Sequence, residues 1–199
     1  MRKLTATLCL MIAVLVGSAG MSASADFQKG YAAYQSGDYA TALREFQPLA
    51  KQGYAPAQFN LGVLYEEGLG VPKNNKTAMK WYSLAAVQGH AKSQYNMGVM
   101  YSNGKGVLQD YKTAVKWYRL AAEQGHAKSH TNLGVMYGTG KGVLKDYIYA
   151  HMWGNIGAMN GNKKGAGLRD FVGTKMTPAD ISKAQDLARE CVRKKYKGC

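Results

Sequence analysis

One eight-residue motif recurs three times at intervals of 36 residues: Gln58-Phe-Asn-Leu-Gly-Val-Leu-Tyr65, Gln94-Tyr-Asn-Met-Gly-Val-Met-Tyr101 and His130-Thr-Asn-Leu-Gly-Val-Met-Tyr137. A fixed period of this length is typical of solenoids, in which each unit buries its apolar face on its neighbours. Solenoids mostly offer extended binding surfaces, so the motif predicts a binding scaffold and not an active site.

The segment 91–126 shows how one unit is built. Its first half has apolar residues and few helix breakers, and it ends at Ser102-Asn-Gly-Lys-Gly-Val107, where glycines permit positive φ. Asp110 then has the position of an N-cap, and apolar residues such as Ala114 and Trp117 follow at helical spacing. Each unit is therefore predicted to be a helix, a glycine loop, a second helix and a tight turn.

Small and large residues recur at fixed places in the units. Glycine stands in the middle of the first helix, at Gly62, Gly98 and Gly134. Such a glycine costs about 1 kcal/mol against alanine, so we expect it to admit a close neighbouring helix. Tryptophan recurs in the second helix, at Trp81, Trp117 and Trp153, where it should fill the space between stacked hairpins. Gly154 and Gly157 replace tyrosine and alanine in the third unit, so its second helix should be the weakest.

Several motifs carry a family resemblance. They are Asn60–Tyr65, the Gly-x-Gly-Val loops at Gly68, Gly104 and Gly140, the Ala-x-x-Trp-Tyr stretches 78–82 and 114–118, and the Ala-Ala-x-Gln-Gly stretches 85–89 and 121–125. Together they resemble Sel-one-like repeats, which are relatives of the tetratricopeptide repeat. The resemblance implies an all-α fold, a right-handed α-solenoid of stacked antiparallel helix hairpins with a C-terminal capping helix.

Four parts of the chain are expected. Residues 1–25 form a cleaved signal peptide, and residues 26–54, with Gly37-Asp38-Tyr39, resemble an ordinary tetratricopeptide hairpin. Residues 55–162 hold three Sel-one-like repeats. Residues 163–199 form a helical cap with a basic tail, whose helix should begin at Thr177-Pro178.

The start of the chain has the pattern of a secretory signal. Arg2 and Lys3 precede the uncharged apolar run Leu4–Val16, and Ala23-Ser24-Ala25 offers a cleavage site before Asp26. Thirteen helical residues span about 20 Å, which is short of a bilayer core of about 30 Å. We therefore expect cleavage near Ala25, a periplasmic or secreted protein, and no transmembrane span in the mature chain.

Cleavage would lower the formal charge from +14 to +12, because Arg2 and Lys3 would be lost. It would leave two cysteines, Cys191 and Cys199. An even pair in an oxidising compartment is a candidate disulfide. Eight residues of straight helix would separate the two by about 12 Å, which is beyond disulfide reach, whereas Gly198 could let the tail fold back. The sequence leaves both outcomes open.

No constellation of residues points to catalysis. His126 and His130 have a spacing that can share a metal on a helix, but His126 belongs to a Gly-His turn that recurs at His90, and no third ligand is near. No nucleophile–base pair can be discerned. We therefore expect neither enzyme activity, nor a metal, nor a cofactor.

The resemblance to tetratricopeptide repeats implies that the first helix of each hairpin lines a concave groove. The candidate ligand-binding residues in that groove are Phe59, Asn60, Lys92, Tyr95, Asn96, Lys128, Thr131 and Asn132. Lys92 with Asn96, and Lys128 with Asn132, are four residues apart and share a helix face. Such lysine–amide pairs suit a carboxylate and the adjacent peptide bond.

Two functions are consistent with these patterns. The first is a non-enzymatic adaptor or regulator in the bacterial envelope, a monomer that holds a peptide or protein partner in the groove. An acidic partner is one candidate. The alternative is a binder of an anionic envelope polymer, peptidoglycan or lipopolysaccharide, through the basic surface. Nucleic acid is not an expected partner of an exported chain.

Overall fold

The computed structural model describes residues 26–199, so the expected signal peptide lies outside the described part. Within these residues all regular secondary structure is helical, which confirms the all-α prediction. Residues 26–36 form a helix. The following helices are α2 (Tyr39–Lys51), α3 (Ala55–Glu67), α4 (Asn75–Val87), α5 (Ala91–Asn103), α6 (Tyr111–Ala122), α7 (Ala127–Thr139), α8 (Tyr147–Met159), α9 (Lys163–Gly173) and α10 (Pro178–Arg193).

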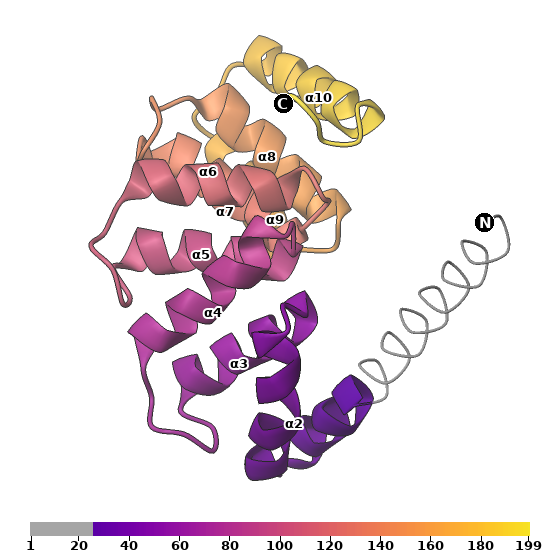
Figure 1. Cartoon of the computed structure of the whole chain (residues 1–199). Coiled ribbons are helices and arrows are strands. Elements are labelled where there is room, and N and C mark those ends of the chain that lie inside the picture. Colours follow the sequence, from indigo (N-terminus) through magenta and orange to yellow (C-terminus); the bar gives the residue numbers. More distant parts are fainter. Residues whose placement is uncertain (1–25) are drawn as a thin grey trace, which may run out of the picture.

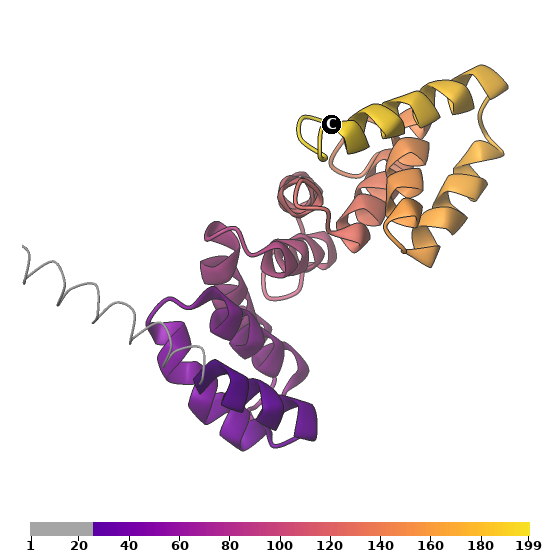
Figure 2. The ribbon, with the colours of Figure 1, turned by 90° about the vertical axis from the view of Figure 1, so that its right-hand side faces the viewer.

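The helices form an elongated array in chain order (Figures 1 and 2). Consecutive helices from α2 to α9 pack on one another, and α10 returns to pack on α8. Each hairpin thus shares its apolar surface with its sequence neighbours, as in a one-dimensional solenoid. The predicted solenoid of stacked helix pairs is confirmed.

The repeat boundaries follow from local backbone chemistry. The first helix of each unit ends at a glycine in the left-handed region, with φ of 76° at Gly68, 67° at Gly104 and 73° at Gly140. The Asp110 side chain accepts a hydrogen bond from the Thr113 N–H and caps α6, as predicted. The Thr177 side chain accepts one from the Asp180 N–H and caps α10 in the same way, again as predicted.

The mid-helix glycines make room for tyrosine rings. A Cβ placed on Gly98 would lie 2.5 Å from ring atoms of Tyr118, and Gly62 faces the ring of Tyr82 in the same way. Tyr82 and Tyr118 are fully buried. The close approach of a neighbouring helix that the sequence predicted is therefore made by the second helix of the same hairpin, through its tyrosine.

The tryptophans pack across the junctions between hairpins, as predicted, but two of them are only partly covered. Trp153 is buried, but Trp81 and Trp117 are only half-buried and lie at the edges of their core clusters. Trp81 packs on a cluster that includes Ala42 and Phe46 of the preceding hairpin, and Trp117 packs on one that includes Tyr82, so both lie between stacked hairpins.

Helix α8 also differs from the prediction. Gly154 lies against backbone atoms of Arg169 and Gly165, and a Cβ on Gly165 would come 2.8 Å from the Ala158 nitrogen. Gly154 thus lets α9 approach the backbone of α8 closely, whereas a Cβ on Gly157 would meet Thr131 of α7. Half of α8 is buried, and it packs on α7, α9 and α10.

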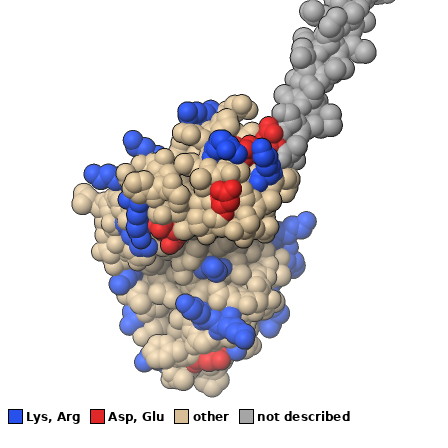
Figure 3. Space-filling view, turned by 90° about the horizontal axis from the view of Figure 1, so that it is seen from below, with Lys and Arg blue, Asp and Glu red and all other residues tan. Residues whose placement is uncertain are grey.

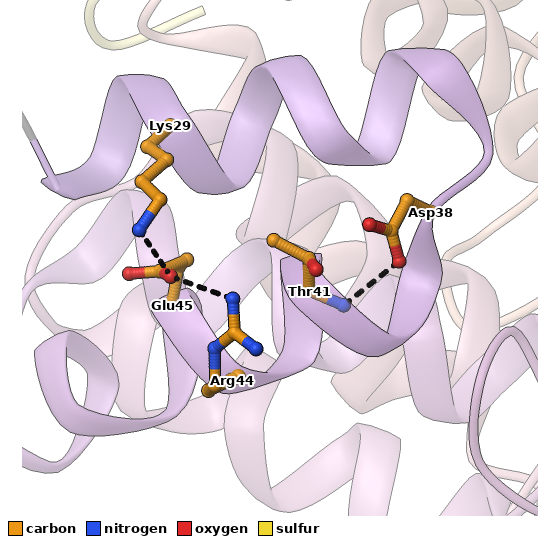
Figure 4. A network of polar contacts seen from close by, with 5 residues as sticks. All are labelled: Lys29, Asp38, Thr41, Arg44 and Glu45. Atoms are coloured by element: carbon orange, nitrogen blue, oxygen red, sulfur yellow. Dashed lines mark hydrogen bonds and ion pairs between the residues drawn. The ribbon is translucent and has the colours of Figure 1, made fainter.

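The first hairpin is joined by polar contacts at its surface (Figure 4). Lys29 Nζ lies 2.9 Å from Glu45 Oε1 and Arg44 Nη2 lies 3.3 Å from the same oxygen. Asp38 accepts a hydrogen bond from the Thr41 N–H at the start of α2. These contacts lower the pKa of Glu45 and of Asp38, but exposed pairs of this kind add little stability.

Candidate functional site

A cleft of about 420 Å³ lies between α5 and α7, the first helices of two successive units. Helix α5 contributes Tyr95, Val99 and Ser102, which recur at three- and four-residue spacing and so share one helix face. Helix α7 contributes Asn132, Val135 and Met136, and the remaining walls are Asn103, Gln109, Tyr111, Tyr118 and Lys141. The cleft thus combines apolar side chains with amides, hydroxyls and one lysine.

Tilted aromatic contacts hold Tyr95 in place at the cleft. Its ring centroid lies 4.7 Å from that of His126 and 6.0 Å from that of Tyr118. Phe59 packs in the same way on His90, at 5.0 Å, one repeat earlier. Burial raises the pKa of Tyr95 and of Tyr118, so both hydroxyls stay protonated and can donate hydrogen bonds.

Two lysines, Lys92 and Lys128, stand in the first turns of α5 and α7, the helices that form the cleft. Lys92 and Lys128 are exposed, and both lower the pKa of His126, after burial as the main cause. Their ammonium groups therefore act on the same imidazole, although they come from different repeats. Within residues 26–199 neither lysine has an ion pair within 4.0 Å, and no acidic residue lines the cleft.

The predicted groove residues divide into four groups, of which the fourth is buried. Tyr95 and Asn132 line the cleft, whereas Lys92 and Lys128 are exposed outside its lining. Asn96 is half-buried and its side chain lowers the pKa of Tyr82, against the larger effect of burial. Phe59 is half-buried on Tyr82 and His90.

Two of the predicted residues are turned into the structure. Asn60 is 7% exposed and its amide nitrogen donates to the Pro56 carbonyl at 2.9 Å. Thr131 is 5% exposed and its hydroxyl donates to the Ala127 carbonyl at 3.3 Å. Both side chains are used by their own helix, so the prediction that they face a ligand is wrong.

The sequence reading missed the loop residues of the cleft. Asn103, Gln109 and Lys141 lie in or beside the Gly-x-Gly-Val loops. Two of these side chains do not recur, since Asn103 is replaced by Thr139 and Gln109 by Lys145 in the next unit. That variation between otherwise identical loops was the available signal.

A ladder of polar side chains joins the repeats on the other side of the first helices. Gln58, Gln94 and His130 each bond a carbonyl eight residues earlier, at Ala50, Ala86 and Ala122. Each also meets an amide thirty residues later, from Gln88, Gln124 and Asn160. Because these side chains are buried and bonded, they stabilise the stacking and are not free for a ligand.

The position of His130 in this ladder also accounts for its protonation state. Burial lowers its pKa to about 4, and a neutral ring with hydrogen on Nε2 can donate to Ala122 while Nδ1 accepts from Asn160. Among the residues that the structure describes, no group of three or more metal-binding side chains is found. The side chains of His126 and His130 instead pack on aromatic rings and form hydrogen bonds with the protein.

The C-terminal tail is tied to the end of the array. A disulfide joins Cys191 and Cys199, whose Cα atoms are 5.6 Å apart. Lys195 and Tyr196 have positive φ, so the chain leaves the helical path and turns back. The Tyr196 ring then lies 4.8 Å from the ring of His130, and its hydroxyl is 3.2 Å from the Asn160 side chain.

The sequence matches the Sel1 repeat family in three consecutive stretches, residues 55–90, 91–126 and 127–162. The chain belongs to the Sel1 repeat family. Sel1 repeat proteins are in general non-enzymatic modules for protein–protein interaction, so protein partners are indicated for this member too. No helix among residues 26–199 is both long and apolar enough to cross a bilayer.

Several solved structures are similar to this Sel1 repeat chain. A Sel1 repeat protein from Oxalobacter formigenes is 32% identical, with a TM-score of 0.66 over 83% of this chain and 75% of that one. A protective antigen of uropathogenic Escherichia coli with an SLR fold is 26% identical, with a TM-score of 0.61 over 87% of this chain and 47% of that one. Helicobacter pylori cysteine rich protein B shares the fold at 22% identity and a TM-score of 0.52, over 65% of this chain and 96% of that one. No curated protein sequence matches.

Proposed function

We propose that the chain is an adaptor or regulator that holds a carboxylate-bearing segment of a protein partner in the cleft between α5 and α7. The observation that carries this proposal is the cleft itself, where aromatic, amide and apolar side chains from two repeats meet. The helices that form it also carry exposed lysines, Lys92 and Lys128, near their N-terminal ends. A cleft with a few convergent polar groups and an apolar wall is the usual form of a ligand site.

The chemistry of the lining suits a peptide. Asn132 and Gln109 offer amide donors and acceptors for a peptide backbone, and Val99 and Val135 offer apolar contact for a side chain. Lys92 and Lys128 stand one helical turn before Asn96 and Asn132, where they can pair with a carboxylate of the bound segment.

We further propose that the protein acts in the bacterial envelope. The apolar run Leu4–Val16 and the small residues at Ala23–Ala25 support export, and a disulfide at Cys191–Cys199 persists best in an oxidising compartment. Binding of an anionic polymer has less support. Figure 3 shows Lys and Arg side chains spread over the visible face among fewer Asp and Glu, without one continuous basic patch.

The test is capture of partners from envelope extract by residues 26–199 at low and moderate salt. Val135 is 39% exposed, so a carboxylate introduced there by Val135→Asp should repel an acidic segment from the cleft. Lys92→Ala with Lys128→Ala should weaken the same capture. The matched controls are Val87→Asp, at a more exposed valine outside the cleft, and Lys116→Ala with Lys183→Ala.

The proposal requires a protein that the native chain and both controls retain and that the cleft variants lose. Apolar contacts should let this capture persist as salt rises, whereas polymer binding through screened charges should collapse. A captured set that is the same for Val135→Asp and Val87→Asp would remove the cleft as the site.

A further inference from the structure

The loops that join α5 to α6 and α7 to α8 carry the two most exposed large apolar side chains of residues 26–199. Leu108 is 89% exposed and Leu144 is 91% exposed. They occupy the same position in successive units, where the first unit has Pro72. Val107 and Val143, directly before them, are half-buried, so the chain places one apolar residue inward and the next one outward.

The two loops are neighbours on one edge of the solenoid. Gly142 of the second loop sits directly on the carbonyl of Tyr111, the first residue of α6, and Tyr111 follows the first loop in the chain. Gly106 sits in the same way on the Asn75 carbonyl at the start of α4. Figure 1 shows the α3–α4 and α5–α6 loops projecting from the same side of the array.

Positive charge surrounds both leucines. The exposed lysines of the loops and of the helix starts that they touch are Lys76, Lys105, Lys112, Lys141 and Lys145. Within residues 26–199 only Lys105 of this set forms an ion pair, with Glu66 at 3.6 Å. The acids of the loops, Asp110 and Asp146, are engaged as N-caps by backbone N–H groups of α6 and α8.

A tyrosine follows each leucine by three residues. Lys141 Nζ lies 5.1 Å from the ring centroid of Tyr111, and Lys145 Nζ lies 4.8 Å from that of Tyr147. Each loop therefore presents an apolar tip, lysines and a half-buried tyrosine, the residue types that favour the boundary between lipid headgroups and acyl chains.

We propose that this loop edge, defined by Leu108, Leu144 and the five lysines, is a docking surface for an anionic lipid membrane. The leucines project singly from loops and neither lines the cleft between α5 and α7, so a partner must accept protruding side chains. A lipid interface accepts them without a matching cavity, and anionic headgroups attract the unpaired lysines. A formal charge of +14 opposes a second copy as the occupant.

The test is cosedimentation of residues 26–199 with vesicles of 70% phosphatidylcholine and 30% phosphatidylglycerol, compared with pure phosphatidylcholine. Residues 26–199 contain every contact described above and omit the apolar run Leu4–Val16, which would itself enter lipid. Binding is expected to the anionic vesicles only, and added salt should weaken it.

Leu108→Ser with Leu144→Ser should weaken vesicle binding roughly tenfold or more, because two apolar side chains no longer enter the lipid. Leu108→Trp should strengthen it. Lys112→Gln with Lys145→Gln should weaken binding and reduce its salt dependence. The matched controls are Val87→Ser with Phe171→Ser, and Lys164→Gln with Lys183→Gln, which change exposed residues elsewhere and should bind as the native chain does.

Thermal unfolding shows whether each variant is folded. Substitutions of the two leucines, which are about 90% exposed, should not change the midpoint of unfolding. The proposal is overturned if the native chain does not bind anionic vesicles at low salt, or if the double leucine variant binds as well as its control. Loss of a captured protein in the leucine variant, without any vesicle binding, would identify the edge as a protein site and reject the lipid assignment.

Discussion

The amide nitrogen of Asn160 lies 3.3 Å from Nδ1 of His130, thirty residues earlier in the chain. Gln88 and Gln58 have the same separation and meet at 2.8 Å, as do Gln124 and Gln94. The third repeat therefore makes the same hydrogen bond, but with His130 in the place of Gln58 and Gln94. Because histidine can be protonated near neutral pH, this one hydrogen bond depends on pH.

Acid should destabilise the protein through His130. Its pKa is about 4 in the folded chain and 6.5 when unfolded, so the unfolded state binds the proton first as pH falls. The stability is complete above pH 6.5 and is lost progressively toward pH 4, where the loss reaches about 3 kcal/mol. The measurement is the free energy of unfolding by urea between pH 4 and pH 8.

His130→Gln is the matched variant for that prediction, because glutamine occupies this place in the other two repeats. Its amide nitrogen can donate to Ala122 and its oxygen can accept from Asn160. The variant should fold at pH 7 and lose less stability than the native chain between pH 6.5 and pH 4. If the free energy of unfolding falls equally with pH in the two proteins, His130 does not cause the acid sensitivity.

Gly98→Ala should destabilise the fold by about 1–3 kcal/mol, because the added methyl group would overlap the buried ring of Tyr118. Gly167→Ala is the control, since Gly167 also lies inside a helix but has nothing within 4 Å of the new Cβ. That control should stabilise the protein by up to about 1 kcal/mol. Urea denaturation would measure both, and a stabilising Gly98→Ala would contradict the tyrosine packing.

Loss of the disulfide should loosen the C-terminal tail. Cys191→Ser with Cys199→Ser removes the disulfide that closes a short loop. A disulfide of this kind typically stabilises the folded protein by about 2–3 kcal/mol. Amide exchange should quicken in α10 and in the loop that presses Tyr196 on His130, while α3 to α6 stay protected. Mass spectrometry of the native chain should find no free thiol at Cys191 or Cys199. Two free thiols, or unchanged exchange in the variant, would contradict this role.

Much of the fold could be predicted because it depends on neighbours in the chain. The helix ends at Gly104 and Asp110 follow from the local chemistry of glycine and of an N-cap aspartate, and the 36-residue period predicts how one unit stacks on the next. The candidate site was less accessible to this reasoning. Of the predicted groove residues, Tyr95 and Asn132 line the cleft, whereas Asn60 and Thr131 are buried.

The sequence by itself determined the helical solenoid, its repeat boundaries and its capping residues, since each depends on backbone preferences within a few residues or on a strict repeat. Only the tertiary structure decided which side chains meet across the helices. The fit of Tyr118 on Gly98, the bond between His130 and Asn160, and the cleft between α5 and α7 depend on distances and rotations between helices. Those distances arise from packing of the whole array, because residues on one helix face can be buried or exposed according to what the next helix covers.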